Sequence, residues 1–571
     1  MKIIFRSINF IRQILPKEEK GKAIKISVLL FFNSFLELLG LGAILPLFLV
    51  LLEDNLLEKY KWLLWIYNAF GLTNEKQLIV VLAVAFLLVI IIKNLISLWI
   101  TKKQNVFCYS LFTKFTIDLH KLYYKYGYPF FKSTNSNVVV RDVRLSSERF
   151  AQAIVLGTLT FMNELIILIF IVTGIAIYNI QILGILLVTV TPVFLFFYSW
   201  VRKRSIELGN IKNRIEPIIG KNIFQSIFGY VDVVVSGAQT NFRDKIEDNV
   251  KELSKVNVKT NIYNLAPTRV IETSLMLAIT VIVAFGIYWL PSKVELIKIL
   301  GLFVIAGYRI MPSINRMMIA INGINQNIWV FDILEPLIKN EDTQVIQKQF
   351  SFNNYLELNA VDFAYPNTNE NVLTNFSLKI KKGEVIGFVG PSGSGKTTVM
   401  NILLGFLKPT KGVYKIDNTV INESYHDDFY KKVGYVQQQV YLLDGTIAEN
   451  IAFGCEAEKI DKKKLKKVIK QASLLEMIEE LEDGVDTMIG ENGAKLSGGQ
   501  RQRVGIARAL YFDAEILFLD EATSALDDKT ETEITESINK LSDGSLTIII
   551  IAHRLSTLEG CSRILEINQK Q

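Results

Sequence analysis

Six long apolar stretches lie within the first ~320 residues of this 571-residue chain. They cover residues 24–52, 77–100, 152–178, 180–201, 267–290 and 295–318. Each approaches or exceeds the roughly 20 helical residues that cross a hydrocarbon layer about 30 Å thick. The later residues mix polar and apolar types as water-soluble α/β domains do. The sequence therefore predicts two domains, one in lipid and one in water, since single cores usually stop growing at about 250–300 residues.

The connections between the apolar stretches differ strongly in length and charge. Residues 101–149 and 202–261 are rich in charged residues at helical spacing, whereas 178–181 and 290–293 are tight turns. Because Lys and Arg collect on the cytoplasmic side, we expect the long connections, the basic N-terminus and the water-soluble domain in the cytoplasm. Residues 56–67 mix aromatic and charged types, which fits either an interfacial helix or a covering loop with a helical turn.

The formal net charge of +7 does not indicate a nucleic-acid partner. Most of the excess lies beside the apolar stretches, where Lys and Arg hold the ends of spans on one side. Cys108, Cys455 and Cys561 are widely separated and show no metal-ligand spacing, so we expect free thiols in a reducing compartment. Neither nucleic acid nor a disulfide framework is therefore expected.

Ionisable residues interrupt the apolar stretches, where each costs at least about 2.5–3.5 kcal/mol at the bilayer centre. They are Glu37, Lys93, Glu164, Arg269, Glu272 and Arg309. One interpretation is internal pairing, for example between Arg269 and Glu272, which lie one helical turn apart. The other is a cavity lined by Lys93, Arg269 and Arg309 that holds an anionic headgroup such as phosphate or pyrophosphate. The sequence leaves both interpretations open.

A phosphate-binding loop is predicted in the second half of the chain. The apolar strand 385–389 leads directly into a glycine-rich turn and then a helix. This segment comprises Gly390, Pro391, Ser392, Gly393, Ser394, Gly395, Lys396, Thr397 and Thr398. Its glycines let N–H groups surround phosphates, Lys396 adds a positive charge, and the Thr397 hydroxyl can bind Mg²⁺. We expect ATP binding here, in a domain at 353–571 that follows a transmembrane domain at 1–325 and a linker at 326–352.

An acidic pair follows a second apolar strand at 516–519. Asp520 is expected to hold the Mg²⁺ shell, and Glu521 to polarise the water that attacks the γ-phosphate. A surface turn is the alternative, but a phosphate loop earlier in the same domain favours the catalytic interpretation.

The segment Leu496-Ser497-Gly498-Gly499-Gln500 lies between the phosphate loop and the acidic pair. Its N–H groups, at the start of a helix, form an anion site. The segment resembles the signature of the ATP-binding cassette (ABC) family, in which Ser497, Gly498, Gly499 and Gln500 close on ATP held by a second subunit. The resemblance implies a multi-domain fold, with an all-α six-span transmembrane domain of exporter type followed by an α/β P-loop nucleotide-binding domain. It also implies ATP and Mg²⁺ as cofactors and a second identical subunit as partner.

The same resemblance assigns further residues to the nucleotide site. Tyr365 resembles the aromatic that stacks on adenine, and His553 resembles the switch histidine that contacts the γ-phosphate. Gln438 resembles the glutamine that senses the γ-phosphate and Mg²⁺, but the flanking Gln437 and Gln439 leave this register open by one residue. The resemblance thus gives catalytic roles to Glu521, His553 and Gln438, and metal binding to Thr397, Gln438 and Asp520.

Within the ABC family, the chain resembles bacterial flippases of lipid-linked oligosaccharides, the PglK type. The residues that carry this resemblance are Phe35–Glu37, Pro267–Glu272 and Tyr308–Arg316, although Thr268 separates the proline from Arg269. It implies a polyprenyl-pyrophosphate glycan as lipid cargo in the bacterial inner membrane, with its charged link held by Lys93, Arg269 and Arg309. A lipid A-type glycolipid is the first alternative cargo, followed by a peptide or drug. An ATP-gated channel or regulator is the alternative from another class, and intact Glu521 and His553 count against it.

Overall fold

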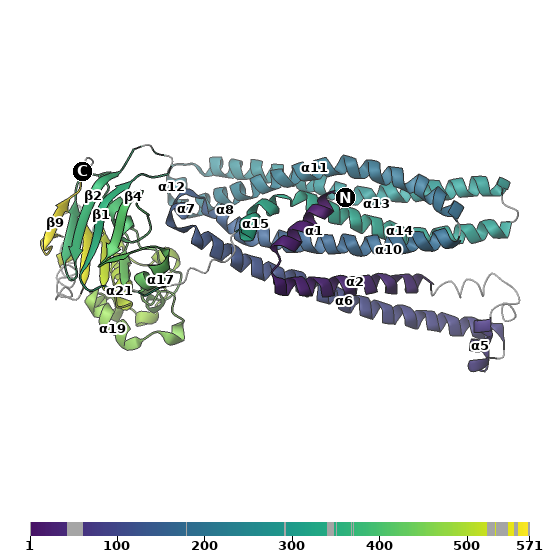
Figure 1. The fold of residues 1–571 in the computed structure, drawn as a ribbon, viewed down its shortest axis with the longest axis horizontal. Coiled ribbons are helices and arrows are strands. Elements are labelled where there is room, and N and C mark those ends of the chain that lie inside the picture. The colour runs from purple at the N-terminus through teal and green to yellow at the C-terminus, as the bar shows by residue number, and fades with distance from the viewer. Residues whose placement is uncertain are drawn as a thin grey trace. The chain divides into compact units, whose positions relative to one another are not determined.

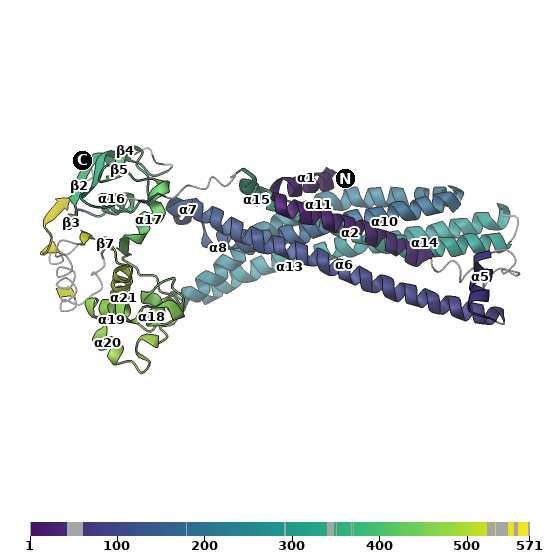
Figure 2. The same ribbon diagram turned by 60° about the horizontal axis from the view of Figure 1, so that its bottom comes forward.

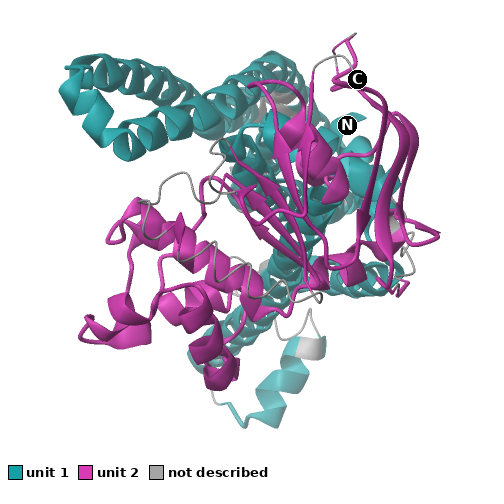
Figure 3. Cartoon of the chain, turned by 90° about the vertical axis from the view of Figure 1, so that its left-hand side faces the viewer, with its two compact units in different colours: residues 1–126, 130–341 teal, residues 127–129, 342–571 magenta. Residues whose placement is uncertain are grey.

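The chain divides into two compact units, coloured separately in Figure 3. Unit 1 comprises residues 1–126 and 130–341, and unit 2 comprises residues 127–129 and 342–571. The computed structural model describes residues 2–42, 61–72, 74–178, 180–289, 293–339, 348–349, 351–366, 368, 370–521, 531–532, 546–552 and 558–568. Most of the predicted linker at 326–352 is therefore helix α15 (Trp329–Lys339) or lies outside the described residues.

All regular structure in the described part of unit 1 is helical, and several of its long helices run side by side (Figures 1 and 2). Besides α15, the helices are α1 (Lys2–Ile14), α2 (Lys17–Gly42), α5 (Lys61–Ala69), α6 (Glu75–Lys125), α7 (Gly127–Ser133), α8 (Ser136–Val140), α9 (Ser147–Arg149), α10 (Gly157–Tyr178), α11 (Ile180–Phe228), α12 (Tyr230–Val235), α13 (Gln239–Trp289) and α14 (Lys293–Gln326). The described part of each predicted apolar stretch falls on these helices. The prediction of an all-α first domain is confirmed.

Four helical segments are long and apolar enough to cross a membrane, namely Lys17–Gly40, Lys76–Lys125, Ser136–Ile177 and Gln239–Ala284. The predicted spans at 180–201 and 295–318 lie on α11 and α14, which include side chains outside the described set. In the second segment only 6% of the most apolar window is buried inside the protein, as expected for a helix that faces lipid. The chain is therefore a multi-pass membrane protein.

Three helices continue far beyond their apolar parts. Helix α6 has 51 residues, α11 has 49 and α13 has 51, so each is about 75 Å long. The charged stretches at 101–149 and 202–261 supply most of these continuations, as predicted from their helical spacing. Two π-helical turns, Arg141–Ser146 and Phe150–Leu156, flank α9 on the way to α10.

Helix α5 forms part of the connection between the first two apolar stretches. Leu63 is fully buried against Leu78 and Leu82 of α6, whereas Trp65 is exposed. Of the two expectations for residues 56–67, the helix therefore holds from Lys61 onwards, and residues 56–60 lie outside the described set.

Unit 2 contains two sheets, and its α/β class is as predicted. An antiparallel sheet of order β2-β1-β4-β5 is formed by β1 (Tyr355–Phe363), β2 (Leu373–Lys381), β4 (Lys411–Ile416) and β5 (Thr419–Val420). A parallel sheet of order β6-β7-β8-β3-β9 is formed by β3 (Val385–Val389), β6 (Val433–Val436), β7 (Ile516–Asp520), β8 (Thr547–Ile551) and β9 (Arg563–Glu566). Because β3, β8 and β7 are parallel neighbours, residues that follow their carboxyl ends meet at one edge.

The helices of unit 2 follow the strands or form a smaller helical region. They are α16 (Lys396–Leu403), α17 (His426–Lys431), α18 (Ile447–Ile451), α19 (Lys462–Gln471), α20 (Leu475–Glu479) and α21 (Gly498–Tyr511). Strands β3, β7 and β8 are buried along nearly their whole length, as expected for a parallel sheet covered on both faces. This rigid sheet positions the predicted nucleotide site.

Candidate functional site

The phosphate loop begins where β3 ends and runs into α16, as predicted from the sequence. Three of its glycines have positive φ angles: Gly390 at 144°, Gly393 at 81° and Gly395 at 100°. A Cβ atom at Gly390 would lie 2.3 Å from the backbone oxygen of Ile567, so a side chain there would displace backbone. The loop is therefore held in a turn that requires glycine.

Polar groups in this loop fit a bound phosphate. Ser394 is 1% exposed, and among the described residues its Oγ has no hydrogen-bond partner. The buried Lys396 Nζ donates to the backbone oxygens of Gly390 (2.8 Å) and Pro391 (2.9 Å). Gly395 begins α16 without a side-chain cap, so the N–H groups of the first turn stay free for an anion. The residues present thus fit the phosphates of ATP.

The acidic pair lies at the carboxyl end of β7. Glu521 has a φ angle of 51°, which is uncommon for a residue other than glycine, and its N–H donates to the backbone oxygen of Ile551 at 2.9 Å. Gln438 Nε2 donates to Glu521 Oε2 at 2.6 Å. This contact favours Gln438 among the three consecutive glutamines for the predicted role beside the γ-phosphate.

The environment of Asp520 fits a metal ligand. Burial raises the pKa of Asp520, and the negative charge of Glu521 acts in the same direction, while the positive charge of Lys396 opposes it. The Tyr435 hydroxyl donates to Asp520 Oδ2 at 3.4 Å. In the described residues no three His, Cys, Asp or Glu side chains are placed to hold a metal ion together, but Mg²⁺ usually needs only one or two protein carboxylates together with phosphate oxygens. Asp520, the Thr397 hydroxyl and the Gln438 amide supply oxygen ligands of this kind.

Tyr365 lies two residues after β1, beside the helix that follows the phosphate loop. Its hydroxyl forms a hydrogen bond of 3.1 Å with Thr398 Oγ1, and its ring meets Phe363 edge-on with centroids 5.0 Å apart. The side chain keeps part of its surface exposed. The structure therefore brings Tyr365 to the nucleotide site without testing its predicted stacking on adenine.

The predicted signature segment forms the start of α21. Ser497 is the N-cap residue, and its Oγ accepts from the N–H of Gln500 at 3.2 Å. In return Gln500 Oε1 accepts from the N–H of Ser497 at 2.8 Å, which completes a capping box. Gly498 and Gly499 occupy the first helical turn, where backbone N–H groups can bind an anion. His553 follows β8 but lies outside the described residues.

Two of the three basic residues predicted for the membrane cavity come together. Lys93 Nζ of α6 lies 2.9 Å, and Arg309 Nη2 of α14 lies 3.2 Å, from the same atom, Glu37 Oε2 of α2. A Cβ atom at Gly40 would lie 2.9 Å from Lys93 Cδ, so this glycine leaves room for the lysine stem along α2. Three helices therefore meet at one carboxylate.

Arg269 is not part of this cluster. Its side chain is 81% exposed, and it pairs with Glu272 on the same helix at 3.1 Å, as the internal-pairing interpretation expected. Elsewhere in unit 1, Arg316 of α14 donates to both oxygens of Glu164 on α10, at 2.6 and 3.1 Å. Internal pairing thus describes Lys93, Arg269 and Arg309 alike, and their contact with an anionic headgroup stays a prediction.

Comparison with known proteins identifies the family. The family described as "ABC transporter" matches residues 373–524. An ATP-dependent lipid A-core flippase of Pasteurella multocida is 30% identical over 448 residues, which cover 77% of this chain and 75% of that protein. The chain belongs to the ABC transporter family.

Two further relatives are also described as ATP-dependent lipid A-core flippases. One from Coxiella burnetii is 31% identical over 381 residues, covering 65% of this transporter and 63% of its own chain. One from Ralstonia nicotianae is 43% identical over 217 residues, and the match spans 36% of that relative, about a third of its length. Among solved structures, a bacterial Atm1-family ABC exporter with ATP bound has a TM-score of 0.75 at 20% identity, covering 97% of this transporter and 94% of that chain. The fold is therefore that of an ABC exporter.

Two contacts of the transporter were not predicted from the sequence. Tyr435, whose hydroxyl reaches Asp520, stands three residues before Gln438, but only the pairing of β6 with β7 shows that it lies beside the acidic pair. Arg316 was noted as part of a motif, yet its pairing with Glu164 depends on how α10 and α14 pack.

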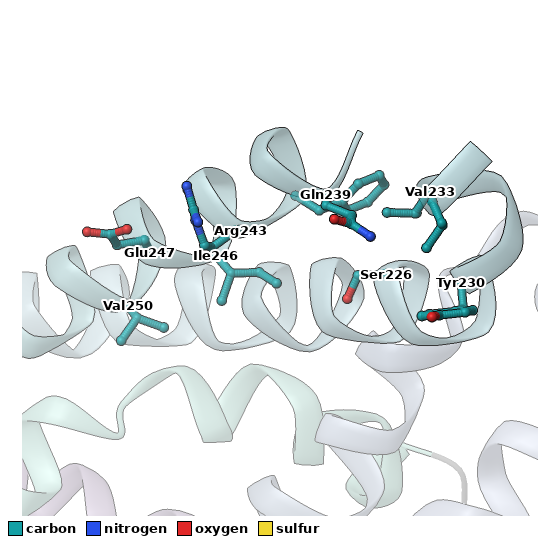
Figure 4. Close-up of a pocket in the computed structure, with 10 residues that line it drawn as sticks. Ser226, Tyr230, Val233, Gln239, Arg243, Ile246, Glu247 and Val250 are labelled. Carbon is teal, nitrogen blue, oxygen red and sulfur yellow. The ribbon is translucent and has the colours of Figure 1, made fainter. Parts of the chain in front are cut away.

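The turn between α11 and α13 carries an apolar hollow of about 440 Å³ (Figure 4). Its walls include Tyr230 and Val233 of α12 together with Phe242, Ile246 and Val250 of α13. Several apolar side chains of α12 are also largely exposed, with Val235 at 82%. This tip of unit 1 thus presents apolar surface that the described part of the chain leaves uncovered.

Proposed function

We propose that this ABC transporter is an ATP-driven exporter that moves a phosphate-bearing glycolipid across the bacterial inner membrane. The observation that carries the proposal is the convergence of the phosphate loop, Asp520, Glu521 and Gln438 at one edge of a parallel sheet, in a chain that also has membrane-spanning helices. The N-terminus and the nucleotide-binding domain then lie in the cytoplasm, since the long charged connections do.

The chain's own residues divide the work of ATP hydrolysis. The phosphate loop and Lys396 bind the phosphates, Glu521 orients and polarises the attacking water, and Gln438 holds the Glu521 carboxylate in place. His553 contacts the γ-phosphate in this proposal. Thr397, Asp520 and Gln438 would hold Mg²⁺, which neutralises phosphate charge when bound. An ATP-gated channel or regulator would need binding alone and would have no use for Glu521.

A second copy of the chain completes the proposed machine. Ser497, Gly498, Gly499 and Gln500 offer an anion site at the start of α21, which is suited to ATP held by a partner cassette. The exposed apolar residues of α12 suit burial in an assembly. We therefore propose a homodimer with two competent ATP sites.

The proposed cargo is a lipid A-type glycolipid. Relatives described as lipid A-core flippases support this choice, and the pair Lys93 and Arg309 supplies charge for a phosphate headgroup. A polyprenyl-pyrophosphate oligosaccharide is the second candidate, because its linkage would meet the same two cations. In either case Arg269, which is exposed and paired with Glu272, is the weakest of the three basic candidates.

The test is a flipping assay in liposomes that contain the purified protein. A labelled lipid A-type glycolipid, or a labelled polyprenyl-pyrophosphate oligosaccharide, is placed in one leaflet, and its transfer is followed with and without ATP. ATP-dependent transfer by the wild type, and its loss in Glu521→Gln, is the expected result. Transfer of the second lipid alone would change the cargo, and ATP hydrolysis without transfer of either would refute the glycolipid proposal.

A further inference from the structure

Glu37 is shared by two cations from two different helices. Lys93 Nζ and Arg309 Nη2 lie 2.9 and 3.2 Å from its Oε2 atom, and all three side chains are only 15–16% exposed. The two positive charges and one negative charge of these three residues sum to a net charge of +1. An unbalanced charge is costly among largely buried side chains, so the cluster has the electrostatic character of a site that awaits another anion.

In the part of the chain that the structure describes, one unpartnered polar atom belongs to Arg309 itself, and another lies one helical turn further along α14. Among the described residues, the buried Nε atom of Arg309 has no hydrogen-bond partner, and neither has Ser313 Oγ, which is 0% exposed. Ser313 follows Arg309 by one helical turn and therefore lies on the same face of α14. Buried donors are nearly always paired in folded proteins, so two orphan donors beside an excess positive charge point to an anionic ligand.

The second ion pair of the same unit shows how a purely structural pair is built here. Glu164 is 5% exposed, and its two oxygens accept from Nε and Nη2 of a single arginine, Arg316. That pair is neutral, and the Nε atom that remains orphaned in Arg309 is satisfied in Arg316. The Glu37 cluster, by contrast, carries a net positive charge and, within the described part of the chain, leaves the Nε atom of its arginine without a partner.

We propose that Glu37 is an internal competitor, which occupies the headgroup site until a phosphate-bearing lipid displaces it from Lys93 and Arg309. A phosphate has more acceptor oxygens than a carboxylate, so it can receive bonds from Lys93 Nζ, from the fork of Arg309 and from Ser313 Oγ together. A lipid without an anionic group cannot make this exchange, so Glu37 stays paired with both cations when only a neutral lipid is present. This inference rests on the proposed function, because it takes the cargo to be an anionic lipid.

Displacement also has a consequence for the helices. Glu37 belongs to α2 and Arg309 to α14, so the ion pair between them joins these helices. A bound phosphate takes over Arg309 and removes this connection. Cargo binding thereby frees α2 from α14 at this level, without any change at the Glu164–Arg316 pair.

The test is equilibrium binding of a radiolabelled, bis-phosphorylated lipid A-type glycolipid to the full chain in nanodiscs. Glu37→Gln keeps the shape of the side chain but removes the competing charge. We expect the Kd of the phosphorylated lipid to fall about tenfold, as it would if only about a tenth of the sites were free of the competitor. The Kd of the same lipid after removal of its phosphates stays unchanged. Glu37→Asp, which keeps the charge on a shorter stem, gives a smaller gain and guards against misfolding of the first variant.

Glu164→Gln is the matched control, because it removes one buried carboxylate from the same unit and leaves Glu37 in place. An unchanged or higher Kd in Glu37→Gln, or an equal gain in Glu164→Gln, would overturn the inference. If the polyprenyl-pyrophosphate probe binds in place of the lipid A-type one and shows the gain, the lipid A-type cargo fails and Glu37 keeps its role. If the wild-type protein flips phosphorylated lipid but Glu37→Gln binds that lipid no more tightly, the inference about Glu37 fails and the proposed function stands.

Discussion

In the proposed mechanism, Glu521 is the residue on which the chemistry of the nucleotide site depends. Its positive φ angle turns the side chain away from the strand direction, and the bond from its N–H to Ile551 fixes this turn to β8. Gln438 then holds one carboxylate oxygen at 2.6 Å. The carboxylate is thus positioned before any nucleotide arrives, as an efficient general base requires.

Glu521→Gln is therefore expected to lower the rate of ATP hydrolysis by about 10²- to 10⁴-fold, the usual contribution of a positioned base. Affinity for ATP should stay within about twofold, because the phosphate loop is untouched. Phosphate release and binding of a fluorescent ATP analogue measure the two effects. Glu456→Gln, which breaks an exposed pair with Lys459, is the control. Hydrolysis near the wild-type rate in the Glu521 variant would remove this residue from the mechanism.

Tyr365 offers a second test at this scale. If its ring stacks on adenine, Tyr365→Ala should raise the Kd for ATP roughly tenfold, in line with about 1–3 kcal/mol per stacked base. Tyr365→Phe removes only the hydrogen bond to Thr398, so its Kd should change by about twofold at most. Equal losses in the two variants would show that the hydroxyl, and not the ring, carries the effect.

Individual site residues differed in how far the sequence could predict them. Lys396, Asp520 and Glu521 follow apolar strands, so local pattern alone placed them at the ends of β3 and β7. Lys93 and Arg309 were expected to act together, but their shared partner depends on the packing of α2, α6 and α14. A sequence contains no direct record of such contacts between helices far apart in the chain.

At the scale of elements, the sequence predicted both the apolar helices and their charged helical continuations. The apolar stretch at 77–100 lies within α6, which runs from Glu75 to Lys125 because charged residues at helical spacing continue it. The π-helical turns on either side of α9 were not predicted, since they arise where one element packs on others and have no local signature. Strands β3 and β7, by contrast, were signalled by short apolar runs.

Two helices begin with the same kind of capping box, so the capping role of Ser497 can be separated from its proposed role in ATP binding. Ser497 caps α21 through Gln500, and Thr446 caps α18 through Glu449 in the same way. Ser497→Ala and Thr446→Ala should each lower the free energy of unfolding by about 1 kcal/mol. Only Ser497→Ala should also lower ATP hydrolysis, by about tenfold or more, because its helix start is offered to ATP. Chemical denaturation measures the free energy of unfolding, and phosphate release measures ATP hydrolysis. Equal losses of ATP hydrolysis in the two variants would show that Ser497 acts only as a helix cap.

At the scale of the whole molecule, the proposed function gives one chain two kinds of surface for ATP. The phosphate loop and acidic pair lie at the edge of the parallel sheet, whereas the signature lies at the start of α21 and bonds internally through Ser497 and Gln500. If two copies each supply one surface to the other, every ATP site contains residues of both chains. Activity then belongs to the pair and not to either subunit.

Mixing of two inactive variants tests this arrangement directly. Lys396→Ala disables the phosphate loop, and Ser497→Arg places a bulky cation in the signature, so each homodimer has two defective sites. In a mixed dimer both defects fall in one site, and the other site combines an intact loop with an intact signature. Random exchange makes half of the dimers mixed, so ATP hydrolysis should recover to about a quarter of the wild-type rate. The two variants are co-expressed with different affinity tags, and phosphate release by the purified mixture of dimers is measured. If each ATP site were built within one chain, ATP hydrolysis would not recover at any ratio of the two variants.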